Sequence, residues 1–218
     1  MGESERPGIT RRSAVVGAGA AAVVLGLGGF RFLPTEPTLR PPGGQATDQV
    51  VSACIRCEKC YEICPREVIV PSHIEAGILN MRTPTLDFSG DYCDWCGEAN
   101  NGDPLCDKVC PTLALRLPEG ASAKNTIIGV AELYTTWCLA YKLIGCRFCY
   151  DACPYEAMEL DGNNRPYVLN DRCNGCGACE SVCVSLQSGS IAEGADERAI
   201  IVRPLRQDGS VLYRWKPS

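Results

Sequence analysis

Cysteine is the residue type that dominates the chemistry of this chain, with 16 cysteines among 218 residues. The first four, Cys54, Cys57, Cys60 and Cys64, precede Pro65. Three thiolates spaced two residues apart can point at one centre, and the run C-x2-C-x2-C-x3-C-P is typical of bacterial ferredoxins that bind [4Fe–4S] clusters. In two-cluster proteins the last cysteine of this run ligates the other cluster. The motif therefore predicts a cluster and a second motif that completes it.

Variations of this run occur three more times along the chain. The second has a loop insertion at residues 97–105, the third has a seven-residue gap after its first cysteine, and the fourth ends in Val184 instead of proline. Motif two is Cys93, Cys96, Cys106 and Cys110; motif three is Cys138, Cys146, Cys149 and Cys153; motif four is Cys173, Cys176, Cys179 and Cys183. The four motifs use every cysteine, which predicts four [4Fe–4S] clusters with all sixteen cysteines as iron ligands.

Disulfides and zinc sites are the alternatives to clusters for these cysteines. Disulfides are disfavoured because triplets of neighbouring sulfurs leave one unpaired. Zinc remains an alternative in motif two, whose C-x2-C and C-x3-C pairs can form a four-thiolate site. His73 is the only histidine and no C-x-x-C-H run occurs, which excludes covalent haem attachment.

The segments that must position these motifs are short. Apolar runs at 68–70, 113–117, 127–134 and 167–169 predict strands beside the motifs. We therefore expect an α+β fold of cluster-binding loops and helices with short β-hairpins. No Ser/His/Asp constellation accompanies the motifs, and a cluster closed by four thiolates leaves no open iron, so no catalytic residue is predicted. A net charge of −5 and a pI near 5.0 give no support for nucleic-acid binding.

The N-terminal region carries the features of an export signal. Arg11 and Arg12 precede an uncharged stretch at 14–30, which is typical of a twin-arginine (Tat) signal. We expect export by Tat to the periplasm or the outer face of the cytoplasmic membrane, with the segment removed or retained as an anchor. The predicted divisions are a signal at 1–33, a Pro/Gly-rich linker at 34–49, a four-cluster domain at 50–205 and a tail at 206–218.

The layout resembles the NapG/MauM family of ferredoxin-type proteins. The resemblance covers the twin-arginine pair, Arg40-Pro-Pro-Gly43, all four motifs and the segments 200–205 and 212–215. Its most specific part is the seven-residue gap between Cys138 and Cys146, and the longer gap in motif two departs from it.

The resemblance implies that two dicluster modules are nested, with motifs one and four in one module and motifs two and three in the other. The first module would then comprise 50–71 with 165–205, and the second 72–164. The implied ligand sets are Cys54, Cys57, Cys60 and Cys183; Cys93, Cys96, Cys106 and Cys153; Cys138, Cys146, Cys149 and Cys110; and Cys173, Cys176, Cys179 and Cys64.

The resemblance also implies an electron-transfer role. A membrane-bound quinol-oxidising iron–sulfur subunit would donate electrons, and a periplasmic reductase or cytochrome, such as a nitrate reductase system, would receive them. The alternatives are the iron–sulfur subunit of a molybdopterin oxidoreductase, which shares the nested layout, and a structural zinc or disulfide protein.

Overall fold

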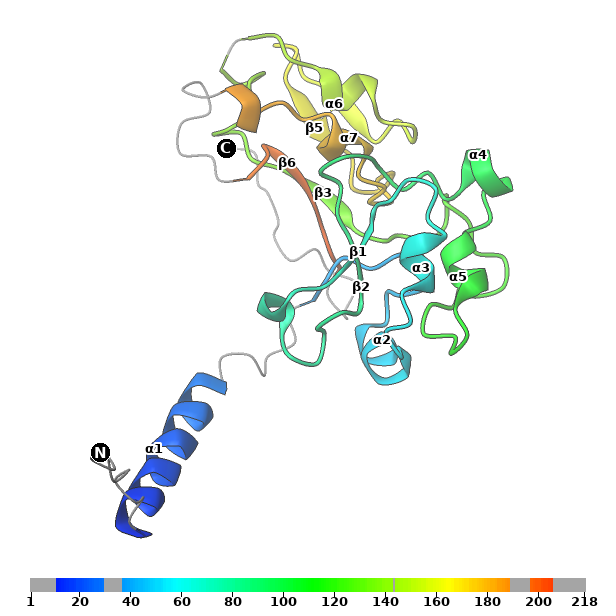
Figure 1. The fold of residues 1–218 in the computed structure, drawn as a ribbon. Helices are drawn as coiled ribbons and strands as arrows, with labels where there is room; N and C mark the ends of the chain where they lie inside the picture. The colour runs from blue at the N-terminus through cyan, green and yellow to red at the C-terminus, as the bar shows by residue number, and fades with distance from the viewer. Residues whose placement is uncertain (1–10, 30–36, 143, 189–196, 206–218) are drawn as a thin grey trace, which may run out of the picture. The chain divides into compact units, whose positions relative to one another are not determined.

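The computed structural model describes residues 11–29, 37–142, 144–188 and 197–205 (Figure 1). The chain divides into two units, one of residues 1–36 with 73–81 and one of residues 37–72 with 82–218. In the first unit, α1 (Arg11–Gly29) contains the twin-arginine pair, whose side chains are exposed, and η2 (Ile74–Ala76) is a single 3-10 turn. Among the described residues, no helix combines the length and apolarity that crossing a membrane requires. The predicted tail at 206–218 lies outside the described residues.

The second unit contains every cysteine and is built from short helices and strands. This mixed architecture confirms the predicted combination of helices and small strands around the motifs. Its helices are α2 (Thr47–Ala53), α3 (Lys59–Glu62), α4 (Gly97–Asn100), α5 (Leu105–Val109), α6 (Phe148–Asp151) and α7 (Ala178–Ser181). Its strands are β1 (Ile69–Pro71), β2 (Pro84–Leu86), β3 (Val130–Leu133), β4 (Met158–Leu160), β5 (Pro166–Val168) and β6 (Ile200–Arg203).

The strands form three antiparallel pairs that show how the motifs are grouped. β1 follows motif one and pairs with β2, which precedes motif two, in the register Ile69 to Leu86. β4 follows motif three and pairs with β5, which precedes motif four. β3 and β6 flank motifs three and four on the outside and pair from Val130–Arg203 to Leu133–Ile200. In Figure 1, β3 and β6 lie side by side, and β4 and β5 belong to the same half of the unit.

The nested arrangement of modules is therefore wrong. A hairpin between consecutive motifs brings those two motifs together, and the helix contacts agree, since α3 contacts α5 and α6 contacts α7. We call motifs one and two with residues 37–72 and 82–117 the first module, and motifs three and four with β3–β6 the second module. The boundaries predicted at residues 71, 72, 164 and 165 do not separate these modules.

The predicted extended linker at 34–49 is wrong for residues 37–49, since residues 37–46 are packed into the first module and residues 47–49 begin α2. Leu39 accepts a backbone hydrogen bond from Leu86 N–H at 2.9 Å, and the Gly43 carbonyl accepts one from Arg116 N–H at 3.0 Å. The segment thus lies against β2 and against the run that follows motif two. That run, at 113–117, was predicted to be a strand and has irregular backbone instead. Within the first module, the segment takes the outer position that β3 holds in the second.

Arg40 anchors this segment although it is a charged residue. Its side chain is 2% exposed, and its Nη1 donates to Thr83 Oγ1 at 2.6 Å and to the Pro84 carbonyl at 2.7 Å. Hydrogen bonds from a charged donor to buried acceptors offset the cost of burying the guanidinium. Sequence reasoning assigned this residue to a linker because Pro and Gly surround it.

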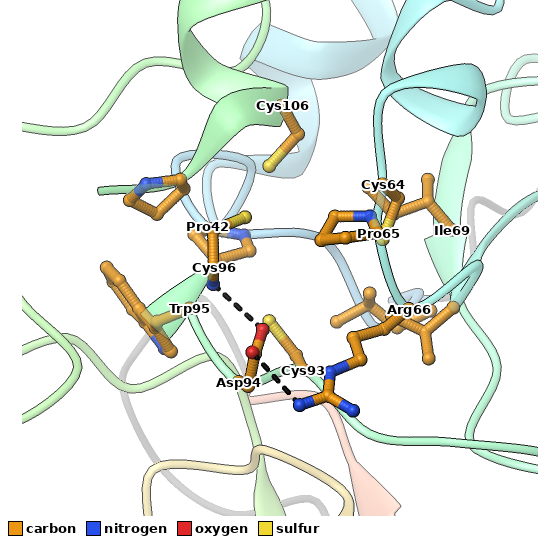
Figure 2. Close-up of a pocket in the computed structure, with 13 residues that line it drawn as sticks. Pro42, Cys64, Pro65, Arg66, Ile69, Cys93, Asp94, Trp95, Cys96 and Cys106 are labelled. Carbon is orange, nitrogen blue, oxygen red and sulfur yellow. Dashed lines mark hydrogen bonds and ion pairs between the residues drawn. The ribbon is translucent and has the colours of Figure 1, made fainter. Parts of the chain in front are cut away.

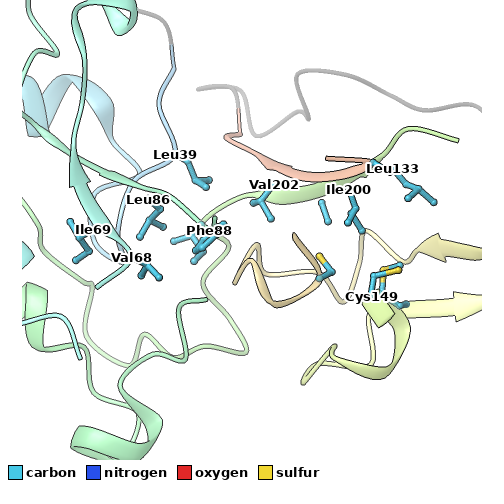
Figure 3. Packing of buried hydrophobic residues seen from close by; sticks show 14 of the residues in the cluster. Leu39, Val68, Ile69, Leu86, Phe88, Leu133, Cys149, Ile200 and Val202 are labelled. Atoms are coloured by element: carbon cyan, nitrogen blue, oxygen red, sulfur yellow. The ribbon is translucent and has the colours of Figure 1, made fainter. Parts of the chain in front are cut away.

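One hydrophobic core extends through both modules. Figure 3 shows buried side chains continuing from Ile69 and Leu86 through Phe88 to Val202 and Ile200. Cysteines 106, 138, 149 and 179 belong to this core, and most of the others pack against it. The cysteine-binding loops are therefore supported by the same packing that joins the two modules.

We predict that Arg40→Leu lowers the free energy of unfolding by about 2–4 kcal/mol, because Thr83 Oγ1 and the Pro84 carbonyl lose a buried donor. Denaturant titration of the cluster-loaded protein measures the change. Arg116→Leu removes an exposed arginine nearby and serves as the control. Equal stability of the two variants would show that residues 37–46 act as a linker after all.

Candidate metal centres

Each motif presents its sulfurs through the same local structure. The third cysteine lies in a helix of one turn, and the fourth follows one or two residues after the end of that helix. The pairs are Cys60 in α3 with Cys64, Cys106 in α5 with Cys110, Cys149 in α6 with Cys153, and Cys179 in α7 with Cys183. The fourth cysteine lies beyond the end of the helix, and the linings of the cavities place the two sulfurs in different sites.

The site best seen in the structure, site two, combines motif two with Cys64. Cys64, Cys93, Cys96 and Cys106 line a cavity of about 360 Å³, including the part open to solvent (Figure 2). Trp95, 1% exposed, closes one side of it. In Figure 2, Asp94 accepts a hydrogen bond from Cys96 N–H at 2.9 Å and forms an ion pair with Arg66 at 3.3 Å. These two contacts hold the Cys93–Cys96 loop in place.

Two further cavities are also lined by three cysteines of one motif and one cysteine of the adjacent motif. Site one is lined by Cys54, Cys57, Cys60 and Cys110 and has a volume of about 380 Å³. Site four is lined by Cys153, Cys173, Cys176 and Cys179 and has a volume of about 320 Å³. Each site is numbered by the motif that supplies three of its sulfurs.

The remaining four cysteines form site three. Burial raises the pKa of the Cys149 thiol to about 12, and the nearby thiols that raise it further are Cys138, Cys146 and Cys183. Burial also raises the pKa of Cys138, with Cys146 and Cys183 again contributing. The four sulfurs therefore lie close enough to interact.

These groupings correct the four predicted ligand sets. The three sulfurs from each single motif come together as predicted, whereas the fourth of each set comes from the adjacent motif. Cys183 lies at site three and not at site one; Cys153 lies at site four and not at site two; Cys110 lies at site one and not at site three; Cys64 lies at site two and not at site four. The physical reason is the pairing of β1 with β2 and of β4 with β5, which places consecutive motifs face to face.

The sites suit a group that contains several metal atoms. Among the described residues, no three or more Cys, His, Asp or Glu side chains are close enough together to hold a single metal ion. The sulfurs instead surround cavities of 320–380 Å³. A zinc ion requires its sulfurs about 2.3 Å from one point, and a [4Fe–4S] core takes one thiolate at each of four separate irons.

Backbone N–H groups point at sulfurs in all the sites with a described cavity. Leu115 N–H lies 3.5 Å from Cys110 Sγ at site one, and Leu105 N–H lies 3.5 Å from Cys96 Sγ at site two. At site four, Ala157 and Ala131 donate to Cys153 and Cys173 at 3.3 and 3.4 Å. Hydrogen bonds to cluster sulfurs stabilise the added negative charge of the reduced state and raise its potential.

Burial keeps many of these thiols neutral before metal enters. It raises the pKa of Cys60, Cys93 and Cys176 to about 12, and that of Cys106 and Cys179 well above the usual value. Iron binds the thiolate, so loading a site expels one proton from each such thiol.

Sequence reasoning missed two charged residues beside site four. Glu180 follows Cys179, and burial raises the pKa of its carboxyl group to about 7. It accepts a hydrogen bond from Val202 N–H at 2.6 Å, which ties α7 to β6. Arg198 donates to the Glu180 carbonyl at 2.8 Å. Glu180 is a non-cysteine position of motif four and Arg198 lies outside the motifs, so only the tertiary packing reveals their roles.

Groups of four sulfurs with a crossed cysteine are typical of ferredoxin-type iron–sulfur proteins, a class whose function is electron transfer. Residues 144–185 match the family of 4Fe-4S dicluster domains, and this range contains the seven cysteines from Cys146 to Cys183. The match joins motifs three and four, in agreement with the second module.

Relatives with assigned names extend this likeness over most of the chain. The ferredoxin-type protein NapG of Escherichia coli (strain K12) is 35% identical over 181 residues, 77% of this chain and 75% of the relative. The methylamine utilization ferredoxin-type protein MauM of Methylobacillus flagellatus is 35% identical over 164 residues, 71% of this chain and 67% of the relative. The ferredoxin-type protein NapF of Escherichia coli (strain K12) is 28% identical over 157 residues, 70% of this chain and 84% of the relative. The chain belongs to the NapG/MauM family of ferredoxin-type proteins, as its motifs predicted.

We predict that Glu180→Gln removes a pH dependence of stability. A carboxyl group whose pKa rises from 4.5 to about 7 on folding stabilises the fold fully below pH 4.5, and this contribution is lost as the pH rises through 7. Arg198 and Arg203 oppose the rise and Asp87 adds to it. The variant should exceed the parent in unfolding free energy by about 3 kcal/mol at pH 8 and match it near pH 4.5.

Urea unfolding between pH 5 and 8.5 measures this difference, with the exposed Glu119→Gln as control. A parent and a Glu180→Gln variant with parallel pH profiles would show that Glu180 is ionised throughout.

Proposed function

We propose that the chain is an exported electron carrier with four [4Fe–4S] clusters, which relays electrons from a membrane quinol-oxidising iron–sulfur subunit to a periplasmic reductase such as nitrate reductase. The observation that carries the proposal is the complete use of cysteine. All sixteen cysteines fall into four groups of four, and each group takes three sulfurs from one motif and one from its neighbour. Each cluster, when bound, takes up and releases one electron.

The residues of the chain would hold the clusters and control their surroundings. The ligands we propose are Cys54, Cys57, Cys60 and Cys110 at site one; Cys64, Cys93, Cys96 and Cys106 at site two; Cys138, Cys146, Cys149 and Cys183 at site three; and Cys153, Cys173, Cys176 and Cys179 at site four. Buried side chains such as Trp95 and Leu115 keep water from the sulfurs. With four thiolates at each site, every iron has a protein ligand, which favours electron relay over substrate chemistry.

The relatives support electron transfer in a chain with partner redox proteins. The NapG likeness supports a reductase system as the acceptor, since the NapG/MauM resemblance implies nitrate reduction as one such case. MauM takes its name from methylamine utilization, which is a system of that protein, so members of the family serve different systems.

Metal analysis and quinol-dependent reduction test the proposal directly. The loaded chain should contain about sixteen iron and sixteen sulfide. Membranes that contain the quinol-oxidising subunit should bleach the cluster absorption after addition of quinol, and membranes without that subunit should not. Zinc without sulfide would refute the carrier function, and bleaching independent of the subunit would refute the proposed donor.

We predict that Cys64→Ala and Cys96→Ala remove the same cluster signal, because both sulfurs belong to site two. Cys176→Ala should remove a different one, that of site four. Electron paramagnetic resonance of reduced protein compares the three variants. If Cys64→Ala and Cys176→Ala instead lost a common signal, the nested pairing would be restored.

Export by the Tat route is a separate prediction. Replacing Arg11 and Arg12 by lysine should leave cluster-loaded protein in the cytosol, since the Tat machinery reads the arginine pair. Cell fractionation with iron analysis of each fraction measures the outcome. Arg6→Lys makes the same chemical change outside the pair and should leave export unaltered. Normal arrival of the double variant in the periplasm would argue against Tat.

A further inference from the structure

The two modules meet where a ligand of site two touches a ligand of site four. Cys93 N–H donates a hydrogen bond of 2.8 Å to the Cys176 carbonyl. Both residues line cluster cavities, Cys93 at site two and Cys176 at site four. One hydrogen bond and the two cysteine residues thus form a continuous path between the sulfurs of the two modules.

The contact is packed so closely that only glycine fits beside it. Gly175 and Gly177 flank Cys176 with φ values of +79° and +86°. A Cβ atom on Gly177 would lie 2.2 Å from the ring of Phe88, and one on Gly175 would lie 2.4 Å from the backbone of Gly129. Phe88 is 1% exposed, so its ring is buried in this contact.

Arg198 makes hydrogen bonds to both modules near the Cys93–Cys176 contact. Its Nη1 donates to the Phe88 carbonyl at 2.9 Å and to the Glu180 carbonyl at 2.8 Å, and its Nη2 donates to the Ser89 carbonyl at 2.7 Å. Phe88 and Ser89 precede Cys93 in the first module, whereas Glu180 follows Cys179 in the second. The planar guanidinium therefore fixes the spacing between the loops that carry the two sites.

Inside each module, the one-turn helices connect the remaining sites. α3 joins Cys60 of site one to Cys64 of site two, and α6 joins Cys149 of site three to Cys153 of site four. The hydrogen bond between the modules involves residues of sites two and four, so sites one and three stand at the two ends.

We propose that electrons pass between the modules at the Cys93–Cys176 hydrogen bond, so that the four sites connect in the order one, two, four, three, and that Arg198 is the residue that positions this junction. The inference rests on the proposed four-cluster function. Each passage moves one electron between the clusters of sites two and four, oxidising one and reducing the other, and no covalent bond forms or breaks. Quinol supplies the electrons through the membrane subunit, and the reductase consumes them.

The proposed order places the partners at sites one and three. Cys57 of site one is exposed, and the neighbouring Ile55 is 63% exposed. At site three, Phe148 is 55% exposed and lies between Cys146 and Cys149. Site one has no buried cysteine, whereas sites two, three and four have two each, so the access we propose at site three rests on the exposed Phe148.

Magnetic coupling between reduced clusters tests the order. Fully reduced protein should show coupling between sites one and two, two and four, and four and three. Cys96→Ala, which empties site two, should leave site one as an isolated signal while sites three and four stay coupled. Cys146→Ala empties site three at the end of the row, and sites one, two and four should remain coupled. Site one still coupled to site three or four in the Cys96→Ala variant would overturn the order.

A second pair of variants tests the junction without removing a cluster. Arg198→Ala should retain the parent's iron content and lose coupling between sites two and four, with partial recovery in Arg198→Lys. Arg147→Ala removes an equal charge beside site three, where Arg147 pairs with Asp151 at 2.7 Å, and should leave that coupling unchanged. Unaltered coupling in Arg198→Ala would overturn the role of Arg198.

Iron content and coupling pattern distinguish failure of the four-cluster function from failure of the proposed order. A parent protein without about sixteen iron and sixteen sulfide refutes the four-cluster function itself. A parent with that content and a different coupling pattern refutes only the order of the sites.

Discussion

The crossing of the fourth cysteine is the constraint on which the rest of the structure depends. Each one-turn helix carries a sulfur near either end, and the two sulfurs belong to different sites. A site is complete only when two such helices lie together, so α3 must meet α5 and α6 must meet α7. The hairpins β1–β2 and β4–β5 satisfy this requirement with three residues per strand. Short strands suffice because metal coordination at both sites would hold the helices in register.

The outer side of the motifs is covered in both modules, but by backbone of different structure. In the second, β6 returns to pair with β3 and seals the outside of the motifs. In the first, the segment around Arg40 fills that position through isolated backbone hydrogen bonds and a buried guanidinium. Proline at 41 and 42 cannot donate to a ladder, which explains why no regular strand forms there. Arg198 and the Cys93–Cys176 contact then join the first module to the second.

The sequence was sufficient to predict the cysteines as ligands, their triplets and the family, because the chemistry of each motif is local. It was not sufficient to predict which motifs pair. Every motif has the same crossing cysteine, so spacing alone is compatible with nested and with consecutive modules, and the choice depends on strand pairing. The apolar run after motif one and the residues before motif two contained that signal in β1 and β2. The burial of Arg40 and the raised pKa of Glu180 depend on residues distant in the chain, so the local sequence does not predict them.

The burial of the thiols has a consequence for the chain before its clusters are inserted. Attack on oxidants and on other disulfides proceeds through the thiolate, and a thiol with a pKa near 12, such as Cys60 or Cys176, is almost wholly protonated at neutral pH. The unloaded fold therefore holds cysteines at close quarters while keeping several of them slow to react. Resistance to premature disulfide formation follows from the same apolar packing that later shields the clusters from water, so one core protects the protein in both stages of its maturation.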